Sequence, residues 1–304
     1  MNDRPIVPTD TWSRPRGLDH VVHAVHDLDA VADVYTRAGL QVGGRNRHPW
    51  GTHNRIIQLP GFFIELLEVA EPEKIVPFAE RQFSFGAFNR DFLKTRQGLS
   101  MVLLASTDAR IDARLFDEAG IGGFDVFDFE REGAGPGGKP IKLAFSLAFA
   151  RDGLSPHAGF AVCQHHFPQN FWNLSRQVHD SGTLGVGGVI LVADNPTDHH
   201  IFMSAFTGVR LLHSSSIGVK SVTPHGDIDL MEAASFRDQF GVVKTITGEG
   251  AELSGLRLRV ADLAKLEAQL RHNDVAFIRL LNRIVIAPET AFGATLIFEA
   301  AIAA

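Results

Sequence analysis

The sequence has only one cysteine, Cys163, among its 304 residues. One cysteine cannot form an internal disulfide, which excludes a small disulfide-stapled scaffold. The chain also lacks an apolar run of about 18 residues, so we predict no transmembrane helix. Its first residues are polar and lack the apolar core of a signal peptide. We therefore expect a cytoplasmic protein without a membrane partner.

Positive charge is scarce as well. The 29 lysines and arginines are outnumbered by 35 aspartates and glutamates, which gives a net charge of −6. Because phosphate binding requires a basic surface, we predict no nucleic-acid partner. The apolar fraction of 45% is that of a globular protein. The length predicts two domains of about 150 residues each.

One supersecondary unit recurs four times along the chain. Each copy starts with a strand, continues through a helix opened by an aspartate, and ends in further strands. The helix-opening residues are Asp27, Asp108, Asp194 and Asp262, and the helices end at Gly39, Gly120, Gly208 and the Asn273-Asp274 pair. A repeated unit is stronger evidence than any single motif. We therefore predict an α+β fold built from four β-α-β-β-β modules.

The modules pair into two halves. Residues 1–16 hold three prolines and predict a loose N-terminal arm. Residues 17–175 hold the first two modules, and residues 185–304 hold the other two. Within the first half, the insert at residues 71–97 is rich in phenylalanine and predicts a short helix or a lid. Its phenylalanines could cover an apolar substrate or simply fill the core.

Several stretches of the first half carry a resemblance to a known family: Leu18-Asp19-His20-Val21-Val22, Asp27-Leu28 and Phe63-Ile64-Glu65-Leu66-Leu67. With the β-α-β-β-β unit they resemble the vicinal oxygen chelate superfamily. Two more stretches resemble its glyoxalase-like branch, the glyoxalase, bleomycin-resistance and dioxygenase type: His48-Pro49-Trp50-Gly51-Thr52-His53-Asn54-Arg55 and Phe160-Ala161-Val162-Cys163-Gln164-His165-His166-Phe167-Pro168. Beyond residue 185 the repeat pattern alone supports the resemblance.

The resemblance implies two domains whose mixed sheets curl into cups. It also implies a divalent metal, such as zinc, manganese, iron or nickel, held by the first and fourth strands of the modules. The implied function is a metal-dependent enzyme that acts on a small oxygen-bearing substrate by lyase, isomerase or ring-cleaving dioxygenase chemistry. The alternative is a metal-free protein that binds and sequesters a small molecule. Paired modules also associate between chains, so a homodimer is a further expectation.

Strand periodicity reduces the number of candidate metal ligands in the first module. Side chains alternate along a strand, so only one of His20 and His23 can face the cup. His20 matches the ligand position of the family, and His23 would then lie against the helix layer. Glu65 lies in the apolar middle of its strand, where an unpaired carboxylate is costly. It therefore needs a metal or a salt bridge with a residue such as Arg55.

The second module departs from this pattern. It has Met101 where the first module has His20, and methionine is a poor ligand for hard cations. Its last strand offers His165 and His166, of which only one can enter the cup, and the resemblance favours His165. We thus predict His20, Glu65 and His165 as the metal ligands.

Two residues of the first half are candidate catalytic groups, Glu65 and His53. A histidine next to the cup could act as a general base. The alternative is that the segment around His53 only forms a turn through Gly51 and Asn54. In the second half, Gly187 and Gly255 occupy the positions equivalent to His20, which predicts a domain without metal that packs against the first or shapes a ligand pocket.

Overall fold

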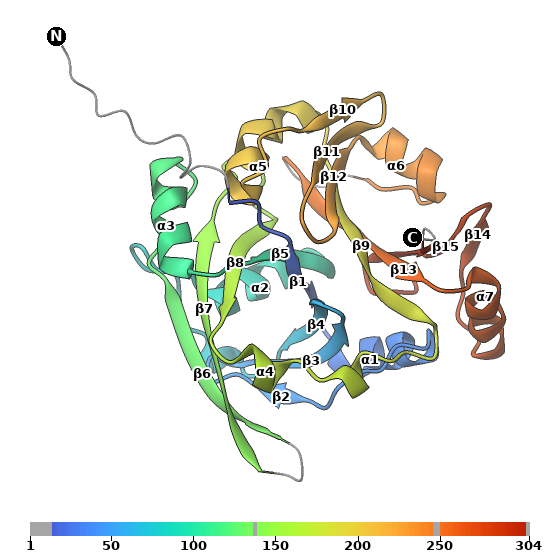
Figure 1. The fold of residues 1–304 in the computed structure, drawn as a ribbon, viewed down its shortest axis with the longest axis horizontal. Coiled ribbons are helices and arrows are strands. Elements are labelled where there is room, and N and C mark those ends of the chain that lie inside the picture. Colours follow the sequence, from blue (N-terminus) through green and yellow to red (C-terminus); the bar gives the residue numbers. More distant parts are fainter. Residues whose placement is uncertain (1–13, 136–138, 246–249, 302–304) are drawn as a thin grey trace.

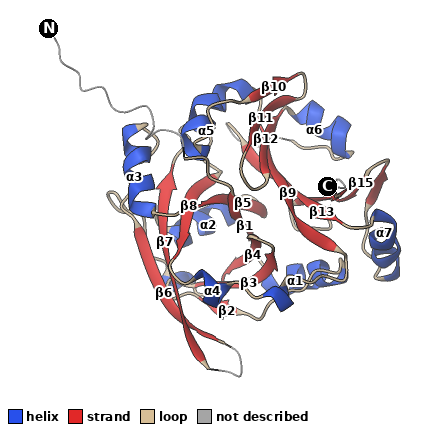
Figure 2. Ribbon diagram, in the orientation of Figure 1, coloured by secondary structure: helices blue, strands red, loops and turns tan. Residues whose placement is uncertain are grey.

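A computed structural model describes residues 14–135, 139–245 and 250–301. Most of the predicted N-terminal arm, residues 1–13, lies outside the described residues. The described strands form two eight-stranded mixed sheets (Figures 1 and 2). The first sheet consists of β1 (Leu18–Ala24), β2 (Asn46–Arg47), β3 (Thr52–Leu59), β4 (Phe62–Val69), β5 (Gly98–Ala105), β6 (Phe127–Ala134), β7 (Pro140–Ala150) and β8 (Gly159–His165). The second sheet consists of β9 (Thr183–Val192), β10 (His213–Ser215), β11 (Gly218–Val222), β12 (Asp227–Met231), β13 (Glu252–Val260), β14 (Ile278–Leu280), β15 (Arg283–Ile286) and β16 (Thr295–Ala300).

The two sheets have the same topology. The strand order is β2-β3-β4-β1-β5-β8-β7-β6 in the first sheet and β10-β11-β12-β9-β13-β16-β15-β14 in the second. The helices are α1 (Leu28–Arg37), α2 (Phe85–Leu93), α3 (Ala109–Glu118), α4 (Pro168–Phe171), α5 (His200–Thr207), α6 (Ala233–Phe240) and α7 (Leu263–His272). The α+β prediction of four β-α-β-β-β modules is therefore confirmed. The predicted domain limits stay a prediction, and β9 begins slightly before residue 185.

The module helices start at the predicted caps, with one exception. The carboxylate of Asp27 accepts hydrogen bonds from the backbone N–H groups of Asp29 and Ala30, and Asp108 and Asp262 cap their helices in the same way. The third predicted cap, Asp194, is wrong, because Asn195 caps the 3₁₀ turn that leads into α5. The cup position of the third module, seven residues before the cap, is therefore residue 188 (195 − 7 = 188).

Each sheet separates two apolar cores. Val22, Phe63 and Met101 belong to a cluster on one side of the first sheet, which we call its inner face. Val21 and Leu66 point to the opposite, outer face, as strand alternation requires. The second sheet has a smaller inner cluster of its own, which includes Ile190, Met231, Phe240, Val285 and Ile297.

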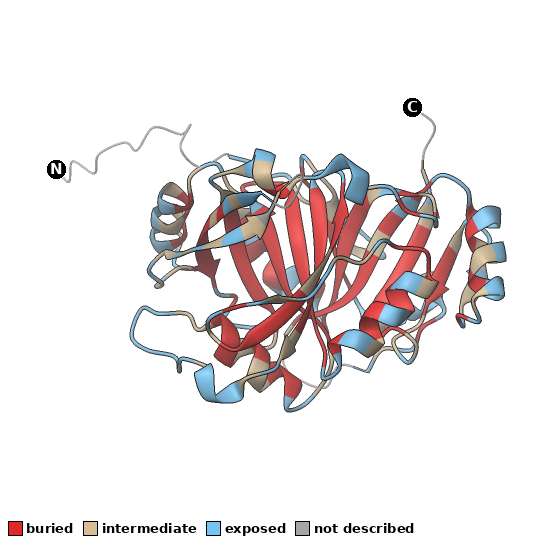
Figure 3. Ribbon diagram, turned by 90° about the horizontal axis from the view of Figure 1, so that it is seen from below, coloured by how far each residue is buried: buried red, intermediate tan, exposed pale blue. Residues whose placement is uncertain are grey.

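The outer faces of the two sheets share one large core. This core takes residues from both sheets and from α1, α3, α5 and α7. Polar bonds join the sheets as well: the Leu18 N–H donates to the His225 carbonyl over 2.7 Å, and His23 Nε2 lies 3.1 Å from the Phe292 carbonyl oxygen. Figure 3 shows buried residues along the central strands and exposed ones on the peripheral helices and loops. The inner face of each sheet is therefore the side that is left for a site.

The insert at residues 71–97 forms helix α2, as one of its two predicted alternatives required. Ser84 caps the helix by accepting a hydrogen bond from the Ala87 N–H. The helix packs on β1 and β4 and brings Phe85 to the inner face of the first sheet. The insert thus closes one side of the first cup.

Candidate functional site

A cavity lies on the inner face of the first sheet, and its lining residues come from several strands of that sheet. Figure 1 shows how strands β1, β3 and β4 and the long β6–β7–β8 edge are arranged. Its walls are mostly aromatic, and a few polar groups converge on it. The lining residues are His20, His48, Trp50, Asn54, Ile56, Phe63, Glu65, Phe85, Phe127, Phe129, Arg131, Phe145, Leu147, Cys163 and Phe171. An apolar pocket with few polar groups is the usual form of a small-molecule site.

A β-bulge shapes one end of this cavity. The pairing of β1 with β5 shifts register between Leu18 and His20, so strict alternation fails there. Asp19 therefore lies beside His20 on the cavity side, and both are almost fully buried. Asp19 Oδ1 lies 2.6 Å from His20 Nδ1, and Asp19 Oδ2 lies 3.1 Å from His165 Nε2. One carboxylate thus holds two histidine rings.

The charge of Asp19 is stabilised by these rings. Burial alone would raise the pKa of Asp19, but the hydrogen bonds and charges of His165 and His20 outweigh it and lower the pKa to about 2. An ionised Asp19 accepts a hydrogen bond from the Nδ1–H group of His20. The other ring nitrogen of His20, Nε2, then carries a lone pair at the cavity wall.

Glu65 reaches the same cavity from β4. The side-chain amide of Asn54 donates a hydrogen bond of 2.5 Å to Glu65 Oε1, and His48 Nε2 lies 3.9 Å from that oxygen. Burial lowers the pKa of His48, with a further lowering by Arg131 that Glu65 opposes, so His48 is neutral at pH 7. The alternative salt bridge between Glu65 and Arg55 is wrong, because Arg55 binds Asp29 over 2.7 Å.

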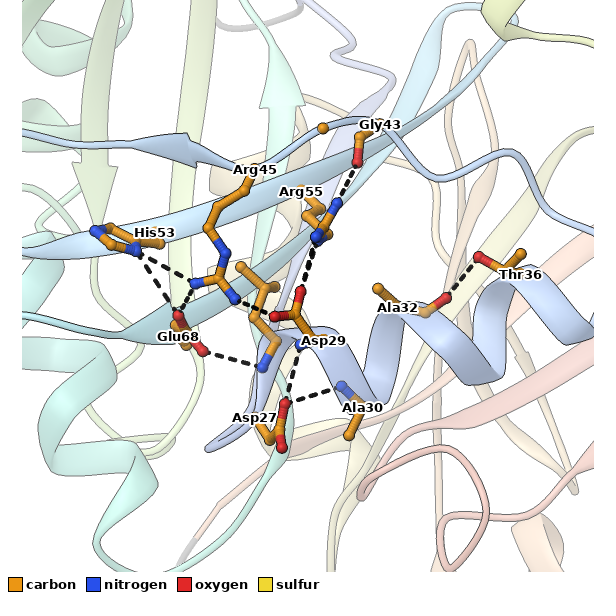
Figure 4. Close-up of polar contacts among 12 residues, drawn as sticks. Asp27, Asp29, Ala30, Ala32, Thr36, Gly43, Arg45, His53, Arg55 and Glu68 are labelled. Atoms are coloured by element: carbon orange, nitrogen blue, oxygen red, sulfur yellow. Dashed lines mark hydrogen bonds and ion pairs between the residues drawn. The ribbon is translucent and has the colours of Figure 1, made fainter.

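His53 and Glu68 lie on the outer face of the first sheet, away from the cavity. Figure 4 shows His53, Glu68 and Arg45 together near the N-terminus of α1. Arg45 also binds Asp29 there, and Glu68 accepts a hydrogen bond from the Leu28 N–H. The structure therefore does not bring His53 to Glu65, His20 or His165.

Of the two neighbouring histidines at the end of β8, His165 faces inward. Its ring stacks on Trp172 with the centroids 5.7 Å apart, and its buried Nδ1 has no hydrogen-bond partner within the described residues. His166 lies on the other face, where its Nε2 is 2.7 Å from the Ser146 hydroxyl. Asp19, Cys163 and His165 have potential ligand atoms within 4.8 Å of one another, and no other such group of three occurs in the described part of the chain.

The strand register defines the equivalent positions in the second module. In the first module, Val22 lies two residues after His20 and pairs with Glu65. In the second, Met101 occupies the place of His20, and Leu103 pairs with Ala161. Neither Met101 nor Ala161 offers a hard ligand, and His165 lies four residues beyond Ala161. The four potential ligand positions of the first cup thus hold two donors.

The second cup has a different content at these positions. They hold Gly188 and Asp229 in the third module and Gly255 and Ile297 in the fourth. The guanidinium of Arg257 lies 2.8 Å from the Asp229 carboxylate, and the Lys220 ammonium lies 3.1 Å from it. The only carboxylate among the four positions is therefore already neutralised by cations of the chain.

Sequence reasoning missed four residues of the first cup: Asp19, His48, Arg131 and Cys163. An acidic residue inside a β-branched run was a signal for Asp19, since a buried carboxylate needs a partner. His48 and Cys163 lay inside stretches already singled out. Arg131 had no signal, because only the tertiary structure places β6 across the cavity from β4.

Comparisons with known proteins agree with this architecture. The family model for the glyoxalase-like domain matches residues 18–205. No curated protein matches the sequence significantly. No helix of the described residues is long and apolar enough to cross a membrane.

Solved structures share the fold at low sequence identity. A hypothetical protein from Staphylococcus aureus is 15% identical with a TM-score of 0.65, and the match covers 94% of this chain and 100% of that one. A mutant 4-hydroxymandelate synthase from Streptomyces coelicolor is 11% identical, with a TM-score of 0.59 and coverage of 94% and 92%. The Mn(II)-bound glyoxalase from Novosphingobium aromaticivorans is 12% identical, with a TM-score of 0.54 and coverage of 95% and 83%. These likenesses concern the fold, and the family model covers more than half of the sequence, so the chain belongs to the glyoxalase-like domain family.

Proposed function

We propose that the protein is a metal-dependent enzyme that acts on a small oxygen-bearing substrate in the cavity of the first sheet. One observation carries this proposal: His20 and Glu65 line the same aromatic-walled cavity from the first and fourth strands of one module. Members of the wider superfamily use such a site in several kinds of chemistry. The metal-bound glyoxalase among the structural neighbours makes an ion in this cup a reasonable hypothesis here.

The donor groups fit a first-row divalent ion such as zinc, manganese, iron or nickel. Imidazole and carboxylate are suitable ligands for these ions. The bond from Asp19 leaves His20 Nε2 as the free donor, which is the usual second-shell arrangement of a metal-bound histidine. His20 and Glu65 would hold the ion. His165 was the predicted third ligand, and its Nδ1 has no partner among the described residues, but it does not form a group of three close ligand atoms with His20 and Glu65.

A bound ion would act as a Lewis acid toward neighbouring oxygens of the substrate, which suits lyase, isomerase or dioxygenase chemistry. The protein groups have separate tasks. Asp19 holds the Nδ1 proton of His20 and fixes its tautomer. Asn54 orients the Glu65 carboxylate. His48, neutral and 3.9 Å from Glu65, is better placed than His53 to accept a proton in the cavity.

Metal analysis of the purified protein tests this proposal. The wild type should hold a stoichiometric divalent metal, and His20→Ala and Glu65→Gln should each lose most of it. His53→Ala and Glu68→Gln are matched controls, because they change the same residue types on the outer face, and both should retain the metal. A metal-free wild type, or equal loss in the control variants, would contradict the proposal.

A metal-free binding protein is the second candidate. The non-ligating side chains Met101 and Ala161 at the second module's positions favour it. Ligand-induced thermal stabilisation, measured with and without a chelator, separates the two candidates. Stabilisation that ignores the chelator supports binding alone, whereas a chelator-induced fall in melting temperature supports the metal enzyme. A homodimer remains a prediction that light scattering on the full chain can test.

A further inference from the structure

Arg131 brings a positive charge into the cavity of the first sheet. It lies on β6 at the edge of the sheet, two residues after Phe129 and four after Phe127, so the three side chains form a row on the inner face. Among the described residues it is the only lysine or arginine that lines this cavity. It also lines a neighbouring pocket with Gly43, Asn46 and Arg176, so it lies between this cavity and that pocket.

Among the described residues, the guanidinium of Arg131 has no ion-pair partner. No described carboxylate lies within 4.0 Å of it, and its one hydrogen bond is a long contact of 3.5 Å to Asn46 Oδ1. Burial lowers the pKa of Arg131, and the charge of the more distant Glu65 only partly opposes this effect. A half-buried cation without a bonded anion is costly, so the free protein leaves one strong donor group unused.

The second cup gives an internal comparison. Its pocket also contains cations, namely Lys220, Arg257 and Arg283. Each of them has at least one carboxylate of the same sheet within 4.0 Å: Asp229 for Lys220 and Arg257, and Glu299 for Arg283. In the second cup, each of these cations therefore has a carboxylate partner. Arg131 in the first cup has none among the described residues.

We infer that Arg131 binds a carboxylate group of the substrate and that the substrate's apolar part lies against the aromatic walls. The planar fork of an arginine matches a carboxylate with two parallel hydrogen bonds. A monoanion is favoured over a phosphate dianion, because Glu65 adds a negative charge to the same cavity. Phe127, Phe129 and Trp50, which contact one another edge-on or tilted, offer faces for the apolar part. This inference rests on the proposed function only in placing the substrate in this cavity.

Binding of matched acids and amides tests the inference. Benzoate and phenylacetate are the acids, and benzamide and phenylacetamide are their neutral counterparts of equal shape. We expect the wild type to bind the acids at least about tenfold more tightly than the amides by calorimetry. Arg131→Gln should remove this preference and leave amide binding unchanged, and Arg131→Lys should keep only part of it. Arg176→Gln, which removes an exposed arginine of the neighbouring pocket, is the matched control and should behave as the wild type.

Repeating the titrations in a chelator separates this inference from the proposed function. An acid preference that persists in the chelator and disappears in Arg131→Gln supports Arg131 as the carboxylate-binding group, even if the protein proves free of metal. A preference that disappears in the chelator but survives in Arg131→Gln would assign the carboxylate to the metal and overturn the inference. Equal binding of acids and amides, or no binding of either, would also overturn it. Circular dichroism of Arg131→Gln verifies that the variant is folded.

Discussion

The two cups of this protein have the same strand order, but they differ in whether their charged side chains are paired with one another. In the first, His20, Glu65 and Arg131 line a cavity and have few charged partners of their own. In the second, Asp229 and Arg257 bind each other and neighbouring charges, so the polar groups satisfy one another. The topology therefore does not determine whether a cup can bind a ligand. That depends on whether its inward-facing charges are already paired.

The largest expected effect contrasts two arginines. Arg257→Met should destabilise the protein by about 3–4 kcal/mol, because it leaves partly buried carboxylates without their main cation. Arg131→Met should leave the free energy of unfolding unchanged or raise it, since it removes an unpaired half-buried cation and leaves no bonded carboxylate behind. Urea unfolding of both variants measures this contrast. Similar losses in the two variants would show that Arg131 has a structural partner after all.

The next-largest expected effect concerns His23, which lies where the two sheets meet. Burial lowers the pKa of His23 to about 4, with a smaller opposing effect of its bond to Phe292. Its pKa in the unfolded chain is about 6.5, so the unfolded state binds more protons between these values and stability falls as the pH drops through that window. The full loss is roughly 3 kcal/mol.

Urea unfolding at pH 7 and pH 4.5 measures this loss. His23→Gln should be less stable at pH 7 but should lose the part of the pH dependence that belongs to His23. Trp50 and Trp172 report on the first sheet, and far-ultraviolet circular dichroism reports on both. If the unfolding transitions seen by fluorescence and by circular dichroism coincide, protonation of His23 unfolds the two cups together. If the pH dependence of the free energy of unfolding is unchanged in His23→Gln, His23 is not the source of that dependence.

A smaller effect is expected from Asp19→Asn. The variant keeps the shape but removes the charge that orients His20 and His165. Loss of such an outer-shell partner typically weakens metal binding by about 10- to 100-fold. Competition with a chelating dye measures the affinity, and the exposed Asp33→Asn is a control that should match the wild type. An unchanged affinity in Asp19→Asn would exclude Asp19 as the residue that orients His20.

The smallest effect would come from adding a ligand to the first cup. Met101→His places a donor at the second module's equivalent of His20 and should tighten metal binding by roughly tenfold. The matching change in the second cup, Gly188→His, should not create a site. A Cβ atom there would lie 2.5 Å from the Asp227 carbonyl oxygen and 2.6 Å from the Arg257 guanidinium. Metal binding by Gly188→His would break the comparison between the cups.

Local sequence signals were enough to predict the fold, and strand periodicity was enough to predict part of the site. Alternation correctly separated His20 from His23, because β1 pairs with β4 without a register shift from His20 to Ala24. It missed Asp19, since a one-residue bulge turns this side chain toward His20. Which face of the sheet His53 lies on depends on where β3 begins. The turn-rich segment before β3 does not indicate that start. Arg131 required the contact between strands far apart in the sequence.

The core shared by the outer faces explains why the second sheet persists although the charges in its cup are paired with one another. Leu191 and Leu256 of the second sheet belong to the same buried cluster as Val21 and Val102 of the first. Their neighbours on the inner face, such as Ile190 and Arg257, touch only the second cup. Substitutions at alternate residues of one strand should therefore have different consequences. Changes to the outward residues disturb the core that both sheets share, while changes to the inward residues alter the chemistry of one cup only.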